Sequence, residues 1–151
     1  MRKLLLASAM SLLVSTTAFA EDIKLGIIFG FTGPIESLTP DMAKGAEAAI
    51  AEVSASGALL NGSTVTGIRA DSTCVDSAVA TANAEKLITS DKVSGIIGAD
   101  CSGVTGAILA NVARANGMVM ISPSATSPGL STAEDDGLFF RTAPSDARQG
   151  Q

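Results

Sequence analysis

The residue types that could do chemistry are few in this chain. It contains no His, Trp or Tyr, so no imidazole can serve as a general base, a triad member or a metal ligand. Asp71 and Asp100 each follow a predicted strand and could form an acid/base pair, although polar loop or capping residues are the commoner outcome. The glycine patterns of dinucleotide-binding loops, P-loops and nucleophile elbows are incomplete or missing. We therefore expect no enzyme, no cofactor and no metal.

Small hydroxyl-bearing residues suit binding instead. Ser102 directly precedes a predicted helix, where its hydroxyl and the free backbone N–H groups could bind an anion such as a carboxylate. The segment 122–128 combines serine and threonine hydroxyls with two prolines that stiffen it. Its small side chains would let a ligand approach the backbone closely. The alternative is a simple helix cap and a simple turn, and the spacing alone favours neither.

Alternating strands and helices would bring these segments together. Apolar runs predict five strands, at 23–29, 65–70, 93–97, 118–121 and 138–142. Helical spacing of apolar residues predicts three intervening helices, from Thr39 to about Gly57, at 76–89 and at 103–116. Such an order forms a parallel sheet with right-handed crossovers, and the near-continuous apolar strands indicate helices on both faces.

Each of the three predicted helices has a predicted buried face, and in the second helix it consists of Ala80, Ala84, Leu87 and Ile88. Thr39 is predicted to cap the first helix, with Pro40 in its first turn. The predicted inward residues are Met42, Ala46, Ala49, Ile50 and Val53 in the first helix, and Val104, Ile108, Val112 and Ala115 in the third. Ligands of parallel sheets bind beyond the carboxyl ends of the strands. The loops 30–38, 71–75, 98–103 and 122–128 should meet there.

Residues 1–20 have the layout of a secretory signal peptide. Arg2 and Lys3 precede an apolar stretch, Leu4–Val14, and residues 18–20 supply the small-x-small cleavage pattern. The apolar stretch is too short to span a membrane, and no cysteine near Ala20 could carry a lipid. We expect a mature chain that begins at Glu21 and works in the periplasm. The alternative is an ordinary N-terminal helix.

Export changes the interpretation of the two cysteines and of the charge. An exported chain meets an oxidising compartment, so Cys74 and Cys101 are predicted to form a disulfide, with two free thiols as the alternative. The whole sequence has 10 lysine and arginine residues against 15 aspartate and glutamate residues. This acidic balance argues against a nucleic-acid partner.

Several short fragments, in a specific order, give the chain a family resemblance. They lie at 23–27, 32–34, 41–46, 98–102 and 120–128, followed by Phe140-Arg141-Thr142. With them the chain resembles the leucine/isoleucine/valine-binding type of periplasmic substrate-binding protein, which serves ABC importers and has the type I periplasmic-binding-protein fold. The resemblance covers nearly all of residues 21–151. Several members also have a cysteine pair placed like Cys74 and Cys101.

The resemblance implies the first lobe of a bilobal α/β protein, with a Rossmann-like parallel sheet flanked by helices. Residues 21–142 would form this N-terminal lobe, and residues 143–151 would start the crossover into the second lobe, where Ser145 and Asp146 predict a helix start. Members of the family are more than twice this length, so we expect an incomplete first lobe. Because lobe closure buries the ligand, this part alone is expected to bind weakly or not at all.

The resemblance also implies a ligand site. Ser102 and Thr126 would hold the α-carboxylate and α-ammonium of an amino acid, helped by backbone groups of Ser124 and Ala125. Phe31 could form a pocket wall, and Glu36 could face a cation. Many members place an aromatic residue where this chain has Glu36-Ser37-Leu38, and relatives with this fold also bind aromatic acids and amides.

Three functions follow from these observations. The first is a periplasmic receptor that captures a branched-chain or other amino acid, or a similar small carboxylate, and delivers it to an inner-membrane ABC permease. The second is a ligand-sensing domain of the same fold for amides or aromatic acids. The third, from a different class, is a small exported α/β enzyme that uses Asp71 or Asp100.

Overall fold

The computed structural model describes residues 20–149, so the predicted signal peptide lies outside the described residues except for Ala20. The strands are β1 (Asp22–Phe29), β2 (Thr64–Asp71), β3 (Gly95–Gly98), β4 (Met120–Ser122) and β5 (Phe139–Arg141). The longer helices are α1 (Thr39–Ala55) and α2 (Ser77–Thr89), and the third predicted helix is divided into α3 (Ser102–Ile108), the π-helical η2 (Leu109–Ala113) and α4 (Arg114–Asn116). Single 3₁₀ turns are η1 (Leu60–Gly62), η3 (Pro128–Ser131) and η4 (Asp146–Arg148).

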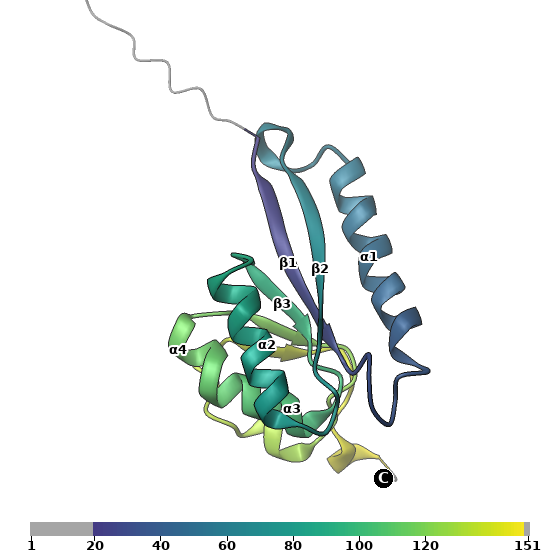
Figure 1. Ribbon diagram of the computed structural model, residues 1–151, viewed down its shortest axis with the longest axis vertical. Coiled ribbons are helices and arrows are strands. Elements are labelled where there is room, and N and C mark those ends of the chain that lie inside the picture. The colour runs from purple at the N-terminus through teal and green to yellow at the C-terminus, as the bar shows by residue number, and fades with distance from the viewer. Residues whose placement is uncertain (1–19, 150–151) are drawn as a thin grey trace, which may run out of the picture.

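All five strands form one parallel sheet in the order β2-β1-β3-β4-β5. The predicted α/β class, with a parallel sheet flanked by helices, is therefore confirmed. Figure 1 shows α1 alongside β1 and β2, and α2 and α3 on the other side of the sheet. The larger core cluster lies between the sheet and the α2/α3 layer, and a smaller one, around Ile27 and Phe29, lies beneath α1. No helix within residues 20–149 is long and apolar enough to cross a membrane.

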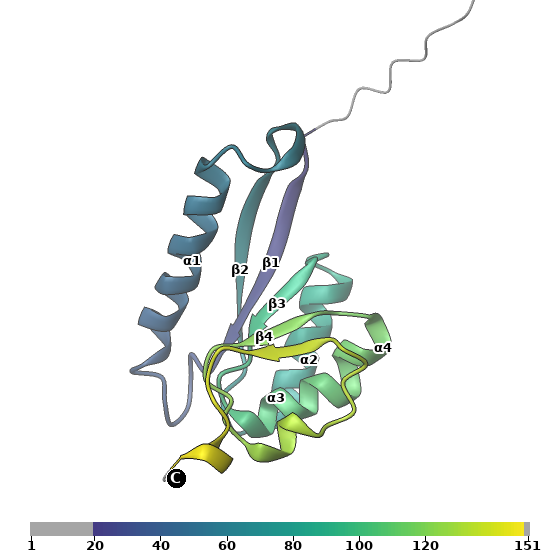
Figure 2. The same cartoon turned by 180° about the vertical axis from the view of Figure 1, so that it is seen from behind.

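The sheet face beneath α1 becomes more exposed from its centre toward β5. Ile27, Ile97, Ile121 and Phe140 lie side by side in the strand register. Ile27 is fully buried, whereas Ile121 and Phe140 are 44% and 54% exposed. In Figure 2, β4 and β5 lie nearest the viewer, with α2 and α3 behind them. Among the described residues, α1 thus covers this face over β1 and β2 only.

The buried face of α1 differs from the prediction for the same reason. Ile50 is buried, and Met42 and Ala46 are half-buried, as expected of inward residues. Ala49 is exposed and Val53 is 44% exposed, contrary to prediction. These side chains face the uncovered part of the sheet, where no described element packs against them.

Two further details of the helices correct the sequence analysis. Leu38, and not Thr39, is the N-cap of α1. Thr39 is fully buried, and its Oγ1 donates a hydrogen bond to the Gly30 carbonyl oxygen at 2.9 Å, so it serves a buried backbone acceptor at the end of β1 instead of the helix. In the third helix, Ala115 is exposed. The π-helical turn η2 has more residues per turn than an α-helix, so buried positions recur there every four residues. Leu109 and Ala113 are therefore buried, and Ala115 is not.

The predicted disulfide is present. Cys74 follows β2, Cys101 follows β3, and their Cα atoms lie 5.2 Å apart within the range that a disulfide spans. The bond joins two loops at the carboxyl edge of the sheet.

The carboxylate of Asp100 forms a second link between loops at the same edge of the sheet. Asp100 is only 3% exposed, and its Oδ2 accepts from the Gly30 backbone N–H at 2.8 Å while its Oδ1 accepts from Ser72 Oγ at 3.0 Å. Its backbone carbonyl oxygen also accepts from Ser124 Oγ at 2.9 Å. A Cβ atom at Gly30 would lie 3.3 Å from the Asp100 carboxylate and 3.2 Å from Cys74, so the close approach favours glycine. One residue therefore connects the loops after β1, β2, β3 and β4.

Removal of the disulfide should lower the free energy of unfolding by about 3–4 kcal/mol, because the crosslink restricts a closed loop of roughly 28 residues in the unfolded chain. The measurement is urea unfolding of the wild type and of the double variant Cys74→Ala/Cys101→Ala. Reductant should destabilise the wild type and leave the double variant unchanged. Equal unfolding midpoints for the two oxidised proteins would contradict the role of the disulfide.

Asp100→Ala should destabilise the chain by about 2–4 kcal/mol, because the Gly30 N–H and the Ser72 hydroxyl lose their acceptors in a buried place. Asp100→Asn should be milder, since the amide keeps one acceptor oxygen and gains a donor that Ser72 can accept. Urea unfolding compares both variants with Glu52→Ala, which removes an exposed carboxylate from α1. If Asp100→Ala lowers the free energy of unfolding no more than Glu52→Ala does, the carboxylate of Asp100 does not hold these loops together.

Candidate functional site

The four loops singled out in the sequence meet at the carboxyl edge of the sheet. The contacts of Asp100 and the disulfide bring together the loops after β1, β2 and β3. The loop after β4 joins them through Ser122, which is fully buried and donates from Oγ to the Ala99 carbonyl oxygen. Ser122 Oγ also accepts from the Ala125 backbone N–H at 2.9 Å. The loop is therefore shaped by its own first serine.

Ser102 lies in the first turn of α3 and contacts the loop after β4. Cys101, and not Ser102, is the N-cap, so the predicted capping position is displaced by one residue. The half-buried Ser102 accepts at Oγ from the Ser127 backbone N–H at 3.0 Å. Ser102 and Thr126 are thus held next to one another by the residue that follows Thr126.

Thr126 forms a reciprocal pair with Asp146. Its Oγ1 donates to Asp146 Oδ2 at 2.9 Å, and the Asp146 backbone N–H donates to the Thr126 carbonyl oxygen at 2.9 Å. A cavity of about 420 Å³ lies beside the pair, lined by Thr126, Pro144, Ser145, Asp146, Arg148 and Gln149. As predicted, Ser145 begins a short helical turn, since its hydroxyl caps η4. The sequence predicts only this local role for Asp146, although the position of Asp146 soon after β5 also indicates the same edge of the sheet.

Arg141 is a second residue that the sequence analysis did not connect with the site. Its Nη1 donates to the carbonyl oxygens of Ala125 and Ser127 at 3.2 and 2.9 Å, and its Nη2 contacts the Ser131 hydroxyl. A guanidinium group offers several donors in a fixed plane, so it can hold several loop carbonyls at once. The backbone of Ala125 is thereby engaged on both sides, with its N–H on Ser122 and its carbonyl on Arg141.

Phe31 and Glu36 lie in the loop after β1. Phe31 is half-buried and packs with the core cluster beneath α1, and the Arg69 guanidinium lies 5.4 Å from its ring centroid. Glu36 is exposed. Neither side chain takes part in the hydrogen-bond network of Ser102, Thr126 and Asp146.

Asp71 and Asp100 both act as hydrogen-bond acceptors within the protein. Burial opposes ionisation of Asp71, but hydrogen bonds from the Thr32 hydroxyl and from backbone N–H groups, including that of Thr73, outweigh it and lower the pKa of Asp71. A general acid at neutral pH needs the opposite shift. Asp100 is enclosed by Gly30 and Ser72. These contacts fit structural roles better than the acid/base pair.

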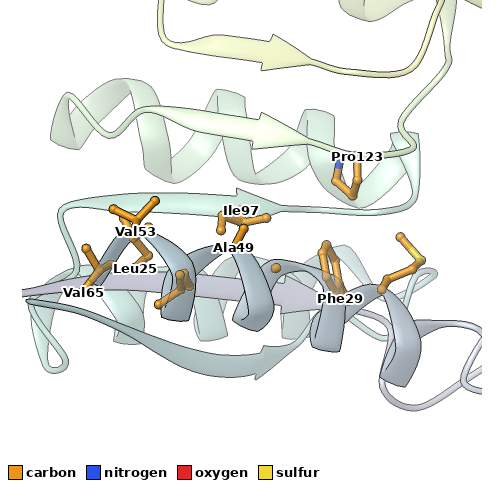
Figure 3. Close-up of a pocket in the computed structure, with 10 residues that line it drawn as sticks. Leu25, Phe29, Ala49, Val53, Val65, Ile97 and Pro123 are labelled. Atoms are coloured by element: carbon orange, nitrogen blue, oxygen red, sulfur yellow. The ribbon is translucent and has the colours of Figure 1, made fainter. Parts of the chain in front are cut away.

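A second concavity lies on the open face of the sheet beneath α1 (Figure 3). It has a volume of about 350 Å³ and is lined by Leu25, Phe29, Met42, Ala46, Ala49, Ile50, Val53, Val65, Ile97 and Pro123. These side chains offer almost no polar group, and a charged ligand would lose its hydration there without compensation. Between the two concavities, the polar carboxyl edge is the candidate site for an ionic ligand.

Comparison with known proteins finds relatives that match nearly the whole chain. The Leu/Ile/Val/Thr-binding protein of Salmonella typhimurium is 35% identical over 148 residues, which are 98% of this chain and 39% of the relative. The Leu/Ile/Val-binding protein of Escherichia coli K12 is 34% identical over the same length. The chain thus spans about 39% of the length of these curated relatives.

Solved structures show the same fold. The substrate-binding protein of a branched-chain amino acid transporter from Streptococcus pneumoniae, in complex with isoleucine, has a TM-score of 0.75 and 32% identity over 84% of this chain and 35% of that one. A solute-binding protein from R. palustris in complex with 4-hydroxybenzoate has a TM-score of 0.69 and 23% identity over 83% of this chain and 32% of that one, and so shares the fold alone.

The family profile described as periplasmic binding protein matches residues 22–151, that is, all but one of the residues after the predicted signal peptide. This match agrees with the parallel sheet, the disulfide across its carboxyl edge and the polar loops that meet there. The chain therefore belongs to the periplasmic binding protein family.

Proposed function

We propose that this chain is the ligand-binding N-terminal lobe of a periplasmic receptor for an ABC importer, and that its ligand is a branched-chain or related amino acid. The observation that carries the proposal is the juxtaposition of Ser102 and Thr126, joined through the Ser127 backbone N–H at 3.0 Å from Ser102 Oγ. Relatives that share the sequence over nearly its whole length are named for binding leucine, isoleucine and valine.

The local chemistry suits a small zwitterion. Ser102 offers a hydroxyl in the first turn of a helical segment that continues to Asn116, where free N–H groups favour a carboxylate. Thr126 and the carbonyl of Ser124 offer acceptors for an ammonium group. The carbonyl of Ala125 already accepts from Arg141, and a carbonyl oxygen can take a second donor. No bond is made or broken, so the proposed role needs no catalytic group.

The proposed mechanism is capture followed by lobe closure. A ligand bound at this edge would be enclosed when a second lobe, reached through residues 143–151, closes over it and excludes water. The closed receptor would then deliver the ligand to an inner-membrane permease. The predicted export signal at residues 1–20 supports a periplasmic location. Glu36 and Phe31 remain candidates for contacts at the rim.

Ser102→Ala and Thr126→Val should each weaken leucine binding about tenfold, because each removes one hydrogen bond to a charged group. Calorimetric titration with leucine and isoleucine measures this, and titration with 4-hydroxybenzoate tests the aromatic-acid alternative. Ser94→Ala, an exposed serine at the opposite edge of the sheet, is the matched control and should bind as the wild type does. Unchanged leucine affinity in both site variants would show that Ser102 and Thr126 only shape the loop.

A further inference from the structure

Asp146 determines the direction in which the Thr126 hydroxyl donates its proton. A hydroxyl has a single proton, and Thr126 Oγ1 donates it to Asp146 Oδ2 at 2.9 Å. An ionised carboxylate accepts hydrogen bonds and cannot donate them. With its proton directed to Asp146, the Thr126 hydroxyl can offer only lone pairs to anything else that approaches it.

Ser102 has the opposite polarity. Its Oγ accepts from the Ser127 N–H at 3.0 Å, and within residues 20–149 no hydrogen bond uses its own proton. Ser102 can therefore donate to an incoming acceptor. The contact with Ser127 thus leaves the Ser102 hydroxyl as a donor, and the contact with Asp146 leaves the Thr126 hydroxyl as an acceptor.

The surrounding loop keeps this arrangement in place. The Thr126 carbonyl accepts from the Asp146 backbone N–H at 2.9 Å, so backbone and side chain of Asp146 hold the same residue. Arg141 binds the carbonyls on either side, those of Ala125 and Ser127. Turning the Thr126 proton elsewhere would break its hydrogen bond to Asp146 and leave a hydroxyl lone pair facing the carboxylate oxygen.

We propose that Asp146 is a specificity-determining residue, which makes Thr126 an acceptor and so selects ligands that carry an ammonium group beside their carboxylate. This inference rests on the proposed function, since it concerns the same site. A carboxylate without an ammonium group would meet the lone pairs of Thr126 and the negative charge of Asp146 with nothing to donate. Arg148, which lines the same cavity, supplies a positive charge but does not alter the direction of the Thr126 hydrogen bond.

The test compares leucine with two analogues that each lack one charged group. 4-Methylpentanoate is leucine without its ammonium group, and 3-methylbutylamine is leucine without its carboxylate. Dissociation constants of all three are measured by ligand-observed NMR titration, which detects weak binding, on the full chain. The wild type should bind leucine at least tenfold more tightly than 4-methylpentanoate. In Asp146→Ala this ratio should fall about tenfold, because Thr126 can turn its proton toward a carboxylate.

Two variants separate the direction of the hydrogen bond from the charge. Asp146→Asn keeps an acceptor oxygen for Thr126 without the negative charge, and should retain most of the discrimination. Glu52→Ala removes an exposed negative charge from α1 and should leave the ratio unchanged. A purely structural role of Asp146 would weaken all three ligands equally and leave the ratio unchanged, which would overturn the inference.

Failure of the inference and failure of the proposed function give different results. Equal wild-type affinities for leucine and 4-methylpentanoate would refute selection by Asp146 while a small-carboxylate receptor survives. Loss of discrimination in Asp146→Asn as large as in Asp146→Ala would assign selectivity to charge and refute the role of hydroxyl direction. If the wild type binds 4-methylpentanoate or 3-methylbutylamine but not leucine, the proposed amino-acid function fails, and the inference fails with it.

Discussion

The buried carboxylate of Asp100 forms the interaction on which the arrangement of the carboxyl edge depends. Parallel strands bring their carboxyl ends to one edge, but the loops that follow are free to diverge unless something joins them. Asp100 accepts from Gly30 and Ser72, and its carbonyl accepts from Ser124, while the adjacent Cys101 is crosslinked to Cys74. A buried carboxylate is strongly unfavourable without such partners. Displacement of any of these loops would remove a hydrogen-bond partner from Asp100 and is therefore costly.

The concavity beside Thr126 and the groove beneath α1 differ in polarity. The groove beneath α1 is lined by apolar side chains, and the exposed Ile121 and Phe140 of β4 and β5 follow its residue Ile97 in the strand register. Apolar surface of this kind suits contact with other apolar groups. The carboxyl edge instead presents hydroxyls whose partners are already chosen by Ser127 and Asp146. Preorganised polar groups of this kind orient a charged ligand without rearrangement.

The features that the sequence predicted are those set by local pattern. Apolar runs and helical spacing located the strands and helices to within a few residues. The predicted parallel arrangement then placed the loops that contain Cys74, Cys101 and Ser102 at one edge of the sheet with the loop after β4. The features that it missed depend on contacts between distant residues. Thr39 serves Gly30, Arg141 holds Ala125, and Asp146 holds Thr126, and no spacing along the chain encodes such partners. The exposure of Ala115 follows from a π turn, which a regular helical period cannot anticipate.

The central claim is that this lobe binds its ligand through the polar carboxyl edge of the sheet and not through the apolar groove. The most direct measurement is a map of backbone amide chemical-shift changes when leucine is added to the isotope-labelled chain. We predict that the largest changes fall on Ser102, Thr126 and Asp146 and saturate together, with the groove residues Ala49 and Val53 unaffected. Changes confined to the groove, with the carboxyl edge unperturbed, would contradict it.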